Sequence, residues 1–195
     1  SSLKAGEVRT LPLVNTIADG TAVKTPGTSI FPYLQENLDD IITIEDDELI
    51  VAFLDVLENH KLLVENSGLL TLAALRHLPA ENKKIVSILS GGNMDIITLS
   101  SVVQNGLIQR SRIFTVSVCL PDVPGQLNKV SKIIADAQGN VIKLEHNQFI
   151  SVNRNNSVEL IITMEAFGED HKHAIIKSLQ DAGYTPDDKN PRALY

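Results

Sequence analysis

Residues 84–93 read Lys-Ile-Val-Ser-Ile-Leu-Ser-Gly-Gly-Asn, and this stretch decides the fold. Its first six residues are apolar except for Lys84 and Ser87, a pattern typical of a strand buried on both faces of a parallel sheet. The run stops at Ser90-Gly91-Gly92, and Asn93 is placed to cap a helix through about Asn105. Ligands bind beyond the carboxyl ends of parallel strands, so the turn is either a ligand site or a plain strand end; spacing favours neither.

The segment before this strand consists of loops and short elements. We expect mostly loop through residue 28, a helix over 29–38 and a short strand over 41–44. Residues 45–48 are all acidic, which suits the positive end of a helix dipole, so they predict a helix start and not a metal site. Ser67 is placed to cap another helix. Residues 1–111 are therefore predicted to form an α/β unit with part of a parallel sheet.

A polar segment at residues 109–112 marks a change of pattern. Beyond it we predict the order strand, helix, strand, strand, helix, strand, with one helix after Pro124 stopping at Gly139. The four strands are expected at 113–120, at 141–151, at 158–164 and from Tyr184 onward. The second helix is expected at 169–182. The order predicts a ferredoxin-like βαββαβ unit over 112–187, followed by a tail over 188–195.

Composition limits the possible partners. The chain of 195 residues is 43% hydrophobic, enough for packed cores, and its net charge of −7 offers no basic stripe for nucleic acid. No apolar stretch is long enough to span a bilayer, which predicts a cytoplasmic protein without membrane contact. The single Cys119 lies in an alternating apolar run and is predicted to be a small buried hydrophobe.

The five histidines form no ligand cluster by spacing. His171 and His173 lie two apart on a predicted helix, so we interpret both as surface residues. His60 and His77 near helix ends are expected to cap carbonyl groups, and His146 is expected to pack or hydrogen-bond within a strand. We predict no metal site.

Several motifs together resemble the second half of the PLP-dependent threonine dehydratases and serine racemases, which are fold-type II enzymes. They stand in the same order and at similar spacing along this chain. The motifs are Ser2-Leu3-Lys4-Ala5-Gly6, Asn15-Thr16-Ile17-Ala18-Asp19-Gly20, Val64-Glu65 and Leu89-Ser90-Gly91-Gly92-Asn93. Beyond them, Asp122-Val123-Pro124-Gly125-Gln126-Leu127 and Glu145-His146-Asn147 resemble the ACT-type regulatory domain attached to many of these enzymes.

The resemblance implies a cofactor role for Ser90, whose hydroxyl would bond the pyridine nitrogen of pyridoxal phosphate (PLP). A hydroxyl does not hold that nitrogen protonated, which moderates the cofactor as an electron sink. Gly91, Glu65 and Gly20 would line the same cavity, and Asp19 would support its wall. Each of these residues has an alternative interpretation as a local cap or turn residue.

The Schiff-base lysine of the family has no counterpart on this chain, because Lys4, Lys24 and Lys61 stand outside the motif that carries it. No catalytic residue is therefore assigned here. The start Ser-Ser-Leu-Lys, without Met, suggests a piece of a longer protein. We expect the intact protein to be a lyase that converts threonine, or serine, and the chain alone to be inactive.

The predicted ACT-like unit has its own candidate site. Backbone N–H groups at a helix start fit an amino-acid carboxylate, and such domains commonly pair side by side. The effector is expected to be isoleucine, valine or AMP, or else the segment serves only assembly into a homo-oligomer, a dimer or tetramer. The candidate residues are Asp122, Gly125, Gln126, Leu127, Asn140 and Val141.

Two classes of function remain open at this level. The chain is either the C-terminal part of an allosteric threonine ammonia-lyase, of the kind used in isoleucine biosynthesis or in threonine breakdown, or a non-catalytic ligand-binding or dimerising module. The residues that precede Ser1 in the gene would separate the two.

Overall fold

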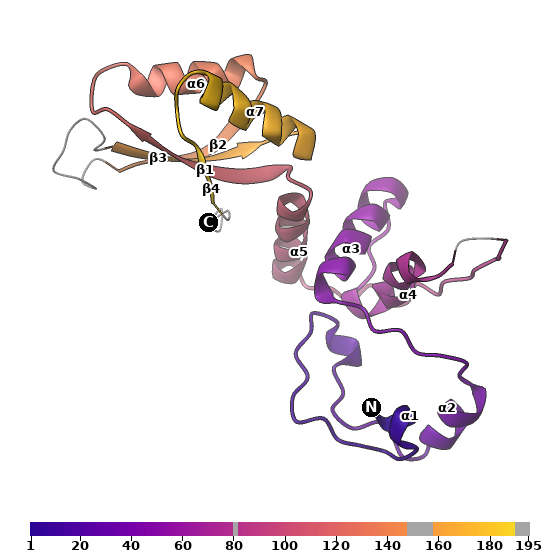
Figure 1. The fold of residues 1–195 in the computed structure, drawn as a ribbon. Coiled ribbons are helices and arrows are strands. Elements are labelled where there is room, and N and C mark those ends of the chain that lie inside the picture. Colours follow the sequence, from indigo (N-terminus) through magenta and orange to yellow (C-terminus); the bar gives the residue numbers. More distant parts are fainter. Residues whose placement is uncertain (80–81, 148–157, 190–195) are drawn as a thin grey trace. The chain divides into compact units, whose positions relative to one another are not determined.

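The computed structural model describes residues 1–79, 82–147 and 158–189. Contacts divide the chain into two compact units, Ser1–Val103 and Gln104–Tyr195, and the boundary falls within helix α5 (Ile96–Gln109). Figure 1 shows helices and irregular segments in the first unit and a sheet with helices in the second. No helix among the described residues is long and apolar enough to cross a membrane.

The first unit is built from short helices around α3 (Asp46–His60). Leu49, Phe53 and Val56 of α3 are buried in one core with Leu69 and Val102. The other helical elements are α1 (Ser2–Ala5), η1 (Asp19–Thr21), α2 (Phe31–Asn37), η2 (Asn66–Leu69), α4 (Leu70–Ala73) and η3 (Ala74–His77).

The acidic run starts α3 as predicted. Glu45 and Glu48 form a capping box, in which each side chain accepts a hydrogen bond from the other residue's backbone N–H. This backbone bond, followed by the contact of Glu48 with the His77 imidazole at 2.6 Å, lowers the pKa of Glu48. His77 therefore contacts a carboxylate, and the prediction that it caps a carbonyl is wrong.

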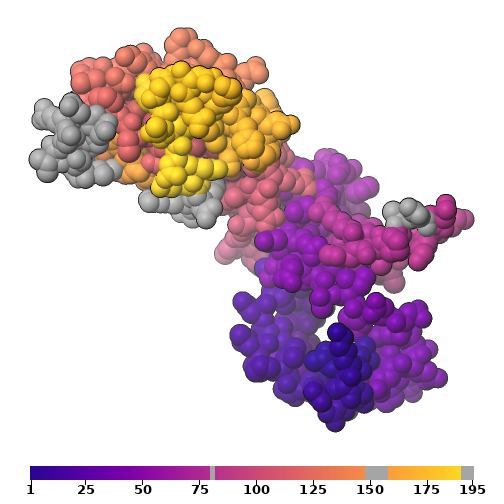
Figure 2. Space-filling model, viewed as in Figure 1, coloured from indigo at the N-terminus to yellow at the C-terminus, as the bar shows by residue number. Residues whose placement is uncertain are grey.

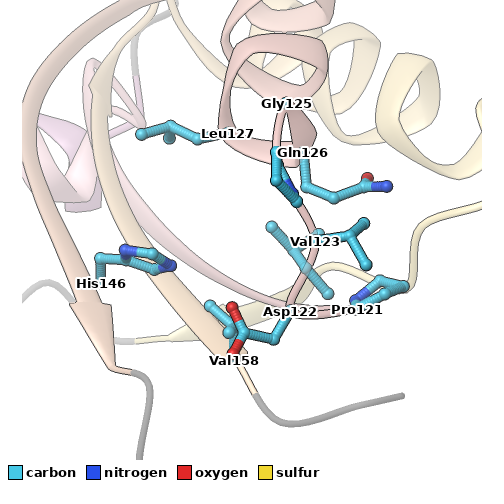
Figure 3. A pocket seen from close by; sticks show the side chains of 10 residues that line it. Pro121, Asp122, Val123, Gly125, Gln126, Leu127, His146 and Val158 are labelled. Carbon is cyan, nitrogen blue, oxygen red and sulfur yellow. The ribbon is translucent and has the colours of Figure 1, made fainter. Parts of the chain in front are cut away.

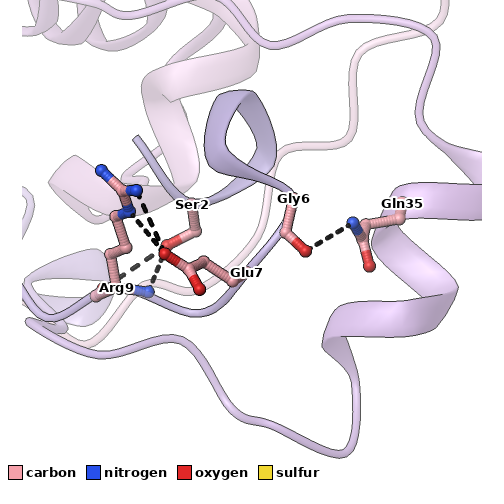
Figure 4. A network of polar contacts seen from close by, with 5 residues as sticks. All are labelled: Ser2, Gly6, Glu7, Arg9 and Gln35. Atoms are coloured by element: carbon pink, nitrogen blue, oxygen red, sulfur yellow. Dashed lines mark hydrogen bonds and ion pairs between the residues drawn. The ribbon is translucent and has the colours of Figure 1, made fainter.

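Polar ties organise the irregular N-terminal segment (Figure 4). The Arg9 N–H donates to Ser2 Oγ at 3.0 Å, and the Arg9 guanidinium pairs with Glu7 at 3.1 Å. Gln35 of α2 donates from Nε2 to the carbonyl of Gly6, the residue that ends α1 in the left-handed region. These bonds join α1 to α2 without a strand.

The predicted parallel sheet is absent from the described residues of the first unit, so that prediction is wrong here. Residues 41–44 and 84–89 form no strand, and Val86 and Ile88 are 89% and 72% exposed. The magenta atoms of this second segment lie at the surface in Figure 2. A strand needs the backbone groups of a neighbour, whereas this segment is attached mainly by side chains, such as Thr71 Oγ1 donating to the Ile88 carbonyl at 2.8 Å.

Two predicted helix caps also differ. Asp95, not Asn93, caps α5, because its Oδ1 accepts hydrogen bonds from the N–H groups of Ile97 and Thr98. The Thr98 hydroxyl also donates to this carboxylate, and these bonds lower the pKa of Asp95. Ser67 does not cap the helix as predicted; its hydroxyl is buried and has no hydrogen-bond partner among the described residues.

The second unit has the predicted order of elements. Its sheet order is β2-β3-β1-β4 with antiparallel pairs, and α6 and α7 lie on the same side of the sheet (Figure 1). The last strand starts at Asp187, three residues after the predicted Tyr184, and residues 148–151 of the predicted second strand lie outside the described residues. The elements are β1 (Ile113–Leu120), α6 (Gln126–Asp136), β2 (Asn140–Asn147), β3 (Val158–Glu165), α7 (Glu169–Asp181) and β4 (Asp187–Lys189).

Alternation along the central strands builds the core. The even-numbered residues of β1 and β3 face the helices and pack against Val130, Ile134, Ile175 and Leu179. Cys119, at an odd position, is exposed, so the prediction that it is buried is wrong. Thr115 and Thr163 pair across the opposite face, with their hydroxyl oxygens 2.9 Å apart.

The two long helices of this unit end in the same hydrogen-bond pattern. Gln138 N–H donates to the carbonyl three residues back after α6, as Gly183 N–H does after α7, and both residues have positive φ angles of 62° and 87°. The left-handed residue after α6 is therefore Gln138, directly before Gly139, at which the helix was predicted to stop. Gly139 is small for another reason: a Cβ there would lie 2.8 Å from Ile134 Cγ2.

His171 joins two elements of this unit and is not a simple surface residue. Its Nδ1 accepts a hydrogen bond from the Phe167 N–H at 3.0 Å, and its Nε2 lies 2.8 Å from the Ala137 carbonyl. The ring also stacks on Phe167. His173 matches its prediction, since it is exposed and its Nε2 lies 3.1 Å from Glu169 Oε1 on its own helix.

Candidate functional site

The glycine turn of residues 90–92 lies against the segment around Glu65. The Glu65 N–H donates to the Gly91 carbonyl at 3.3 Å. A Cβ on Gly91 would lie 2.1 Å from Glu65 Cδ, and the residue has a φ of 74°. Position 91 therefore requires glycine both for its backbone angle and for the approach of the Glu65 carboxyl group.

Ser90 is held by its backbone while its side chain is exposed. The Ser90 carbonyl oxygen would lie 1.7 Å from a Cβ on Gly68, so the two backbones are in close contact. The Ser90 hydroxyl makes no hydrogen bond with the residues that the structure describes. The turn thus presents this hydroxyl on a fixed backbone.

The loop of residues 16–20 forms another wall of this site. A Cβ on Gly20 would lie 2.9 Å from Ser67 Oγ and 3.8 Å from Glu65 Oε1. Asp19 lies at the edge, where its Oδ1 accepts a hydrogen bond from the Gly20 N–H at 2.8 Å. The structure therefore places Gly20, Glu65 and Gly91 together, with Asp19 directed at its own loop.

The backbone of Ile17 is held by hydrogen bonds at both its N–H group and its carbonyl group. Its N–H donates to Asp46 Oδ2 of α3 at 3.1 Å, and its carbonyl accepts from Asn66 Nδ2 at 3.0 Å. Asn66 is buried, and its Oδ1 has no hydrogen-bond partner in the described part of the chain. These two side chains fix the loop that carries Gly20.

Sequence reasoning missed Asp46, Asn66, Ser67 and Gly68 as parts of this site. Asp46 was interpreted only as an acidic residue at a helix start, and Ser67 only as a cap. The usable signal was the glycine at position 68, because glycine lowers helix stability and its presence at a predicted helix start suggests a packing reason.

A separate cavity of about 290 Å³ lies in the second unit at the start of α6 (Figure 3). It receives four of the six residues predicted for a regulatory ligand: Asp122, Gly125, Gln126 and Leu127. Gly125 is the N-cap residue of α6 with a φ of 89°, and this N-cap makes no side-chain hydrogen bond to the helix. The remaining lining residues are Leu120, Pro121, Val123, Pro124, His146 and Val158.

Asn140 and Val141 do not line this cavity, and their assignment to the regulatory ligand stays a prediction. Both lie at the start of β2, and Asn140 Nδ2 donates to Glu165 Oε2 at 2.7 Å. The cavity instead receives His146 from the far end of β2. The alternation of β2 was the available signal, since it places His146 on the helix-facing side.

A larger cavity of about 910 Å³ lies in the first unit and corresponds to no sequence prediction. Its lining includes Ser2, Lys4 and Gln35; Ser2 and Gln35 also take part in the polar contacts of Figure 4. Asp39 and Asp40 line it as well. Across the described ranges, no three His, Cys, Asp or Glu side chains are grouped so as to hold a metal ion.

Comparison with known proteins identifies the class first. Residues 1–91 match the family described as "Pyridoxal-phosphate dependent enzyme". This match includes Gly20, Glu65 and Ser90 and ends at Gly91. The chain is accordingly a homologue of the fold-type II enzymes that depend on PLP.

Within that class the relatives are threonine ammonia-lyases, also called threonine dehydratases. The chain is 37% identical over 188 residues to the L-threonine ammonia-lyase of Geobacter sulfurreducens, covering 95% of this chain and 47% of that protein. It is 29% identical to the L-threonine ammonia-lyase of Thermotoga maritima, covering 94% and 46%. The chain is a homologue of these lyases and spans about half their length.

Proposed function

We propose that this chain forms part of a PLP-dependent threonine ammonia-lyase, which converts L-threonine to 2-oxobutanoate and ammonia. The observation that carries the proposal is the 37% identity to the Geobacter sulfurreducens L-threonine ammonia-lyase over 95% of the chain. The clustering of Ser90, Gly91, Glu65 and Gly20 in one place supports it.

The residues present fit the ring end of PLP. The Ser90 hydroxyl is exposed and makes no hydrogen bond with the described residues, so it is available to donate to the pyridine nitrogen. When bound, PLP supplies an electron sink for bond breaking at the α-carbon of an amino acid. A serine partner leaves the ring nitrogen unprotonated, which suits loss of the substrate hydroxyl without further side reactions.

The surrounding residues hold this hydroxyl in position. Gly91 and Gly68 allow the close backbone contacts described above, and the Glu65 carboxyl group closes the side next to Gly20. Asp19 has a smaller role, because its carboxylate is occupied by the Gly20 N–H. No residue of this chain is assigned to bond breaking, and we expect the chain alone to be inactive.

A chimera tests the proposal. This chain replaces the aligned segment of the Geobacter sulfurreducens L-threonine ammonia-lyase, and 2-oxobutanoate is measured with L-threonine and with L-serine. We expect a PLP-loaded chimera that produces 2-oxobutanoate from threonine, while the isolated chain with PLP produces none. A chimera that folds and retains PLP but leaves threonine unchanged would contradict the proposal.

The second unit is proposed to be an ACT-like regulatory domain over residues 112–187 that binds a branched-chain amino acid. Its support is the cavity at the uncapped start of α6, where free N–H groups and the helix dipole favour a carboxylate. The buried Leu120 and Val158 provide an apolar floor for a branched side chain. Calorimetry with isoleucine, valine and AMP tests this assignment. If neither isoleucine nor valine gives a heat of binding, the assignment is contradicted.

The same unit is proposed to pair with a second copy. Strand β2 is at the edge of the sheet, and its Val141, Ile142 and Leu144 are 36% to 41% exposed. An unpaired edge strand with apolar side chains favours pairing with another strand. Light scattering of the chain should give a dimer or tetramer, and Ile142→Lys should shift it toward the monomer.

One observation favours the alternative of a non-catalytic module. The second unit has a closed core and its own cavity, whereas residues 84–89 of the first unit are exposed. Amino-acid binding by the chain together with an inert, PLP-loaded chimera would favour this alternative over the lyase.

A further inference from the structure

A carboxylate and an imidazole side chain face each other across the cavity at the start of α6. Figure 3 shows the carboxylate of Asp122 and the imidazole of His146 turned toward the space between the loop and strand β2. Neither side chain makes a hydrogen bond or ion pair with the described part of the chain. Both groups are thus available to a ligand.

Two other kinds of polar group lie at the cavity, the side-chain amide of Gln126 and the first backbone N–H groups of α6. Gln126 Oε1 accepts a hydrogen bond from the Tyr184 hydroxyl at 3.3 Å, which directs this amide toward the end of α7. The first N–H groups of α6 have no side-chain cap and favour an anion. An amino acid whose carboxylate lies at α6 would have to place its ammonium group elsewhere in the cavity.

We propose that Asp122 and His146 together form the ammonium subsite of this cavity, and that His146 makes ligand affinity sensitive to pH. This inference rests on the proposed amino-acid binding by the second unit. The Asp122 carboxylate supplies the counter-charge, and the unprotonated nitrogen of a neutral imidazole accepts a hydrogen bond from the ammonium group. Protonation of the imidazole removes this acceptor and adds a repelling positive charge.

Among the described residues that line the cavity, Asp122 is the charged side chain beside His146. The register partner of His146 on the neighbouring strand β3 is Leu160. Leu120 of β1, Leu127 of α6 and Val158 of β3 line the same cavity. Lys143 and Glu145 of its own strand lie at alternate positions on the opposite face and pair with each other at 3.4 Å. Asp122 is therefore the charged side chain that faces His146 among the residues lining the cavity.

The experiment is calorimetric titration of the full chain with valine at pH 8, 7 and 5.5. Because protonation of the imidazole would remove the acceptor and add a positive charge, we expect the affinity for valine to fall about tenfold from pH 8 to pH 5.5. In His146→Gln the fall should disappear, since an amide accepts a hydrogen bond without titrating. His173→Gln, which changes an exposed histidine of α7, should retain the fall.

A second ligand tests the ammonium assignment in the unaltered chain. The keto acid 3-methyl-2-oxobutanoate has the carboxylate and branched chain of valine but no ammonium group, and it should bind at least tenfold more weakly at pH 8. Valine affinity that does not change with pH, or an equal fall in His146→Gln, would overturn the role of His146 while leaving amino-acid binding intact. Absence of binding by both valine and isoleucine would instead overturn the proposed sensing function and this inference with it.

Discussion

Residues 84–89 and residues 113–120 are both apolar runs, yet only the second is a strand. Ile113–Leu120 pairs with β3 on one side and β4 on the other, and its helix-facing side chains are buried. Residues 84–89 have no strand partner among the described residues, and Val86 is 89% exposed. The comparison teaches that an apolar pattern specifies a strand only where the chain also supplies the strands beside it.

The largest expected difference in stability is between substitutions of Ile162, on the strand that pairs with residues 113–120, and of Ile88, within residues 84–89. Ile162 of β3 is fully buried, so Ile162→Ala should lower the free energy of unfolding of the second unit by about 3 kcal/mol. Ile88→Ala should change stability by less than about 0.5 kcal/mol because that side chain is 72% exposed. Urea unfolding followed by circular dichroism measures both, and equal losses would show that residues 84–89 are packed in solution.

Gly68 tests the contact that holds the Ser90 turn. An alanine there would place Cβ 1.7 Å from the Ser90 carbonyl oxygen, so Gly68→Ala should cost about 1–3 kcal/mol. Gly92→Ala is the control, because its Cβ would lie 3.5 Å from the nearest atom, the Leu63 carbonyl oxygen. Hydrogen exchange should increase in residues 64–71 only for Gly68→Ala; unchanged exchange in both variants would argue against the contact.

The two helix ends of the second unit predict changes of opposite sign. Gly183→Ala forces a side chain into the left-handed region and should lower stability by about 1 kcal/mol. Gln138→Gly relieves the same penalty after α6 and should raise stability by up to about 1 kcal/mol. Thermal unfolding compares the two variants, and a loss of stability in Gln138→Gly would refute the equivalence of these ends.

The smallest effect concerns acid. The Ser111 hydroxyl donates to Glu169, and this bond lowers the pKa of Glu169 below its usual value. A carboxyl group whose pKa is lowered in the folded protein stabilises the fold at pH values above its usual pKa. This stabilisation is lost as the pH falls through the lowered pKa. In Ser111→Ala the pKa of Glu169 should rise, so stability should change less between pH 5 and pH 3. An acid titration identical to that of the unaltered chain would contradict this.

The sequence predicted the second unit well because its signals are local. Alternation fixed the faces of β1, and the order of elements followed from the turn residues around Pro124 and Gly183. The acidic run before Leu49 likewise marked the start of α3. The cap at Asp95 was missed because Asn93 offered a competing cap two residues earlier.

Other features could not be predicted because they depend on distant contacts. The buried Asn66 reaches Ile17, 49 residues earlier, and no spacing rule connects the two. His146 enters the cavity through strand register, which places it beside Leu160, whereas Asn140 and Val141 lie at the other end of the same strand. The candidate PLP residues were found through family resemblance, since the glycine turn alone did not separate a ligand site from a strand end.

The role of Ser90 is tested most directly by PLP retention in the Geobacter sulfurreducens chimera. Ser90→Ala is compared with Ser87→Ala, a serine of the same segment whose hydroxyl bonds to the Thr71 carbonyl. PLP affinity, followed by visible absorbance during dialysis, should fall by about tenfold in Ser90→Ala, the equivalent of one hydrogen bond, and stay unchanged in Ser87→Ala. Equal PLP affinity in Ser90→Ala and the unaltered chimera would contradict the assignment of Ser90 to the cofactor.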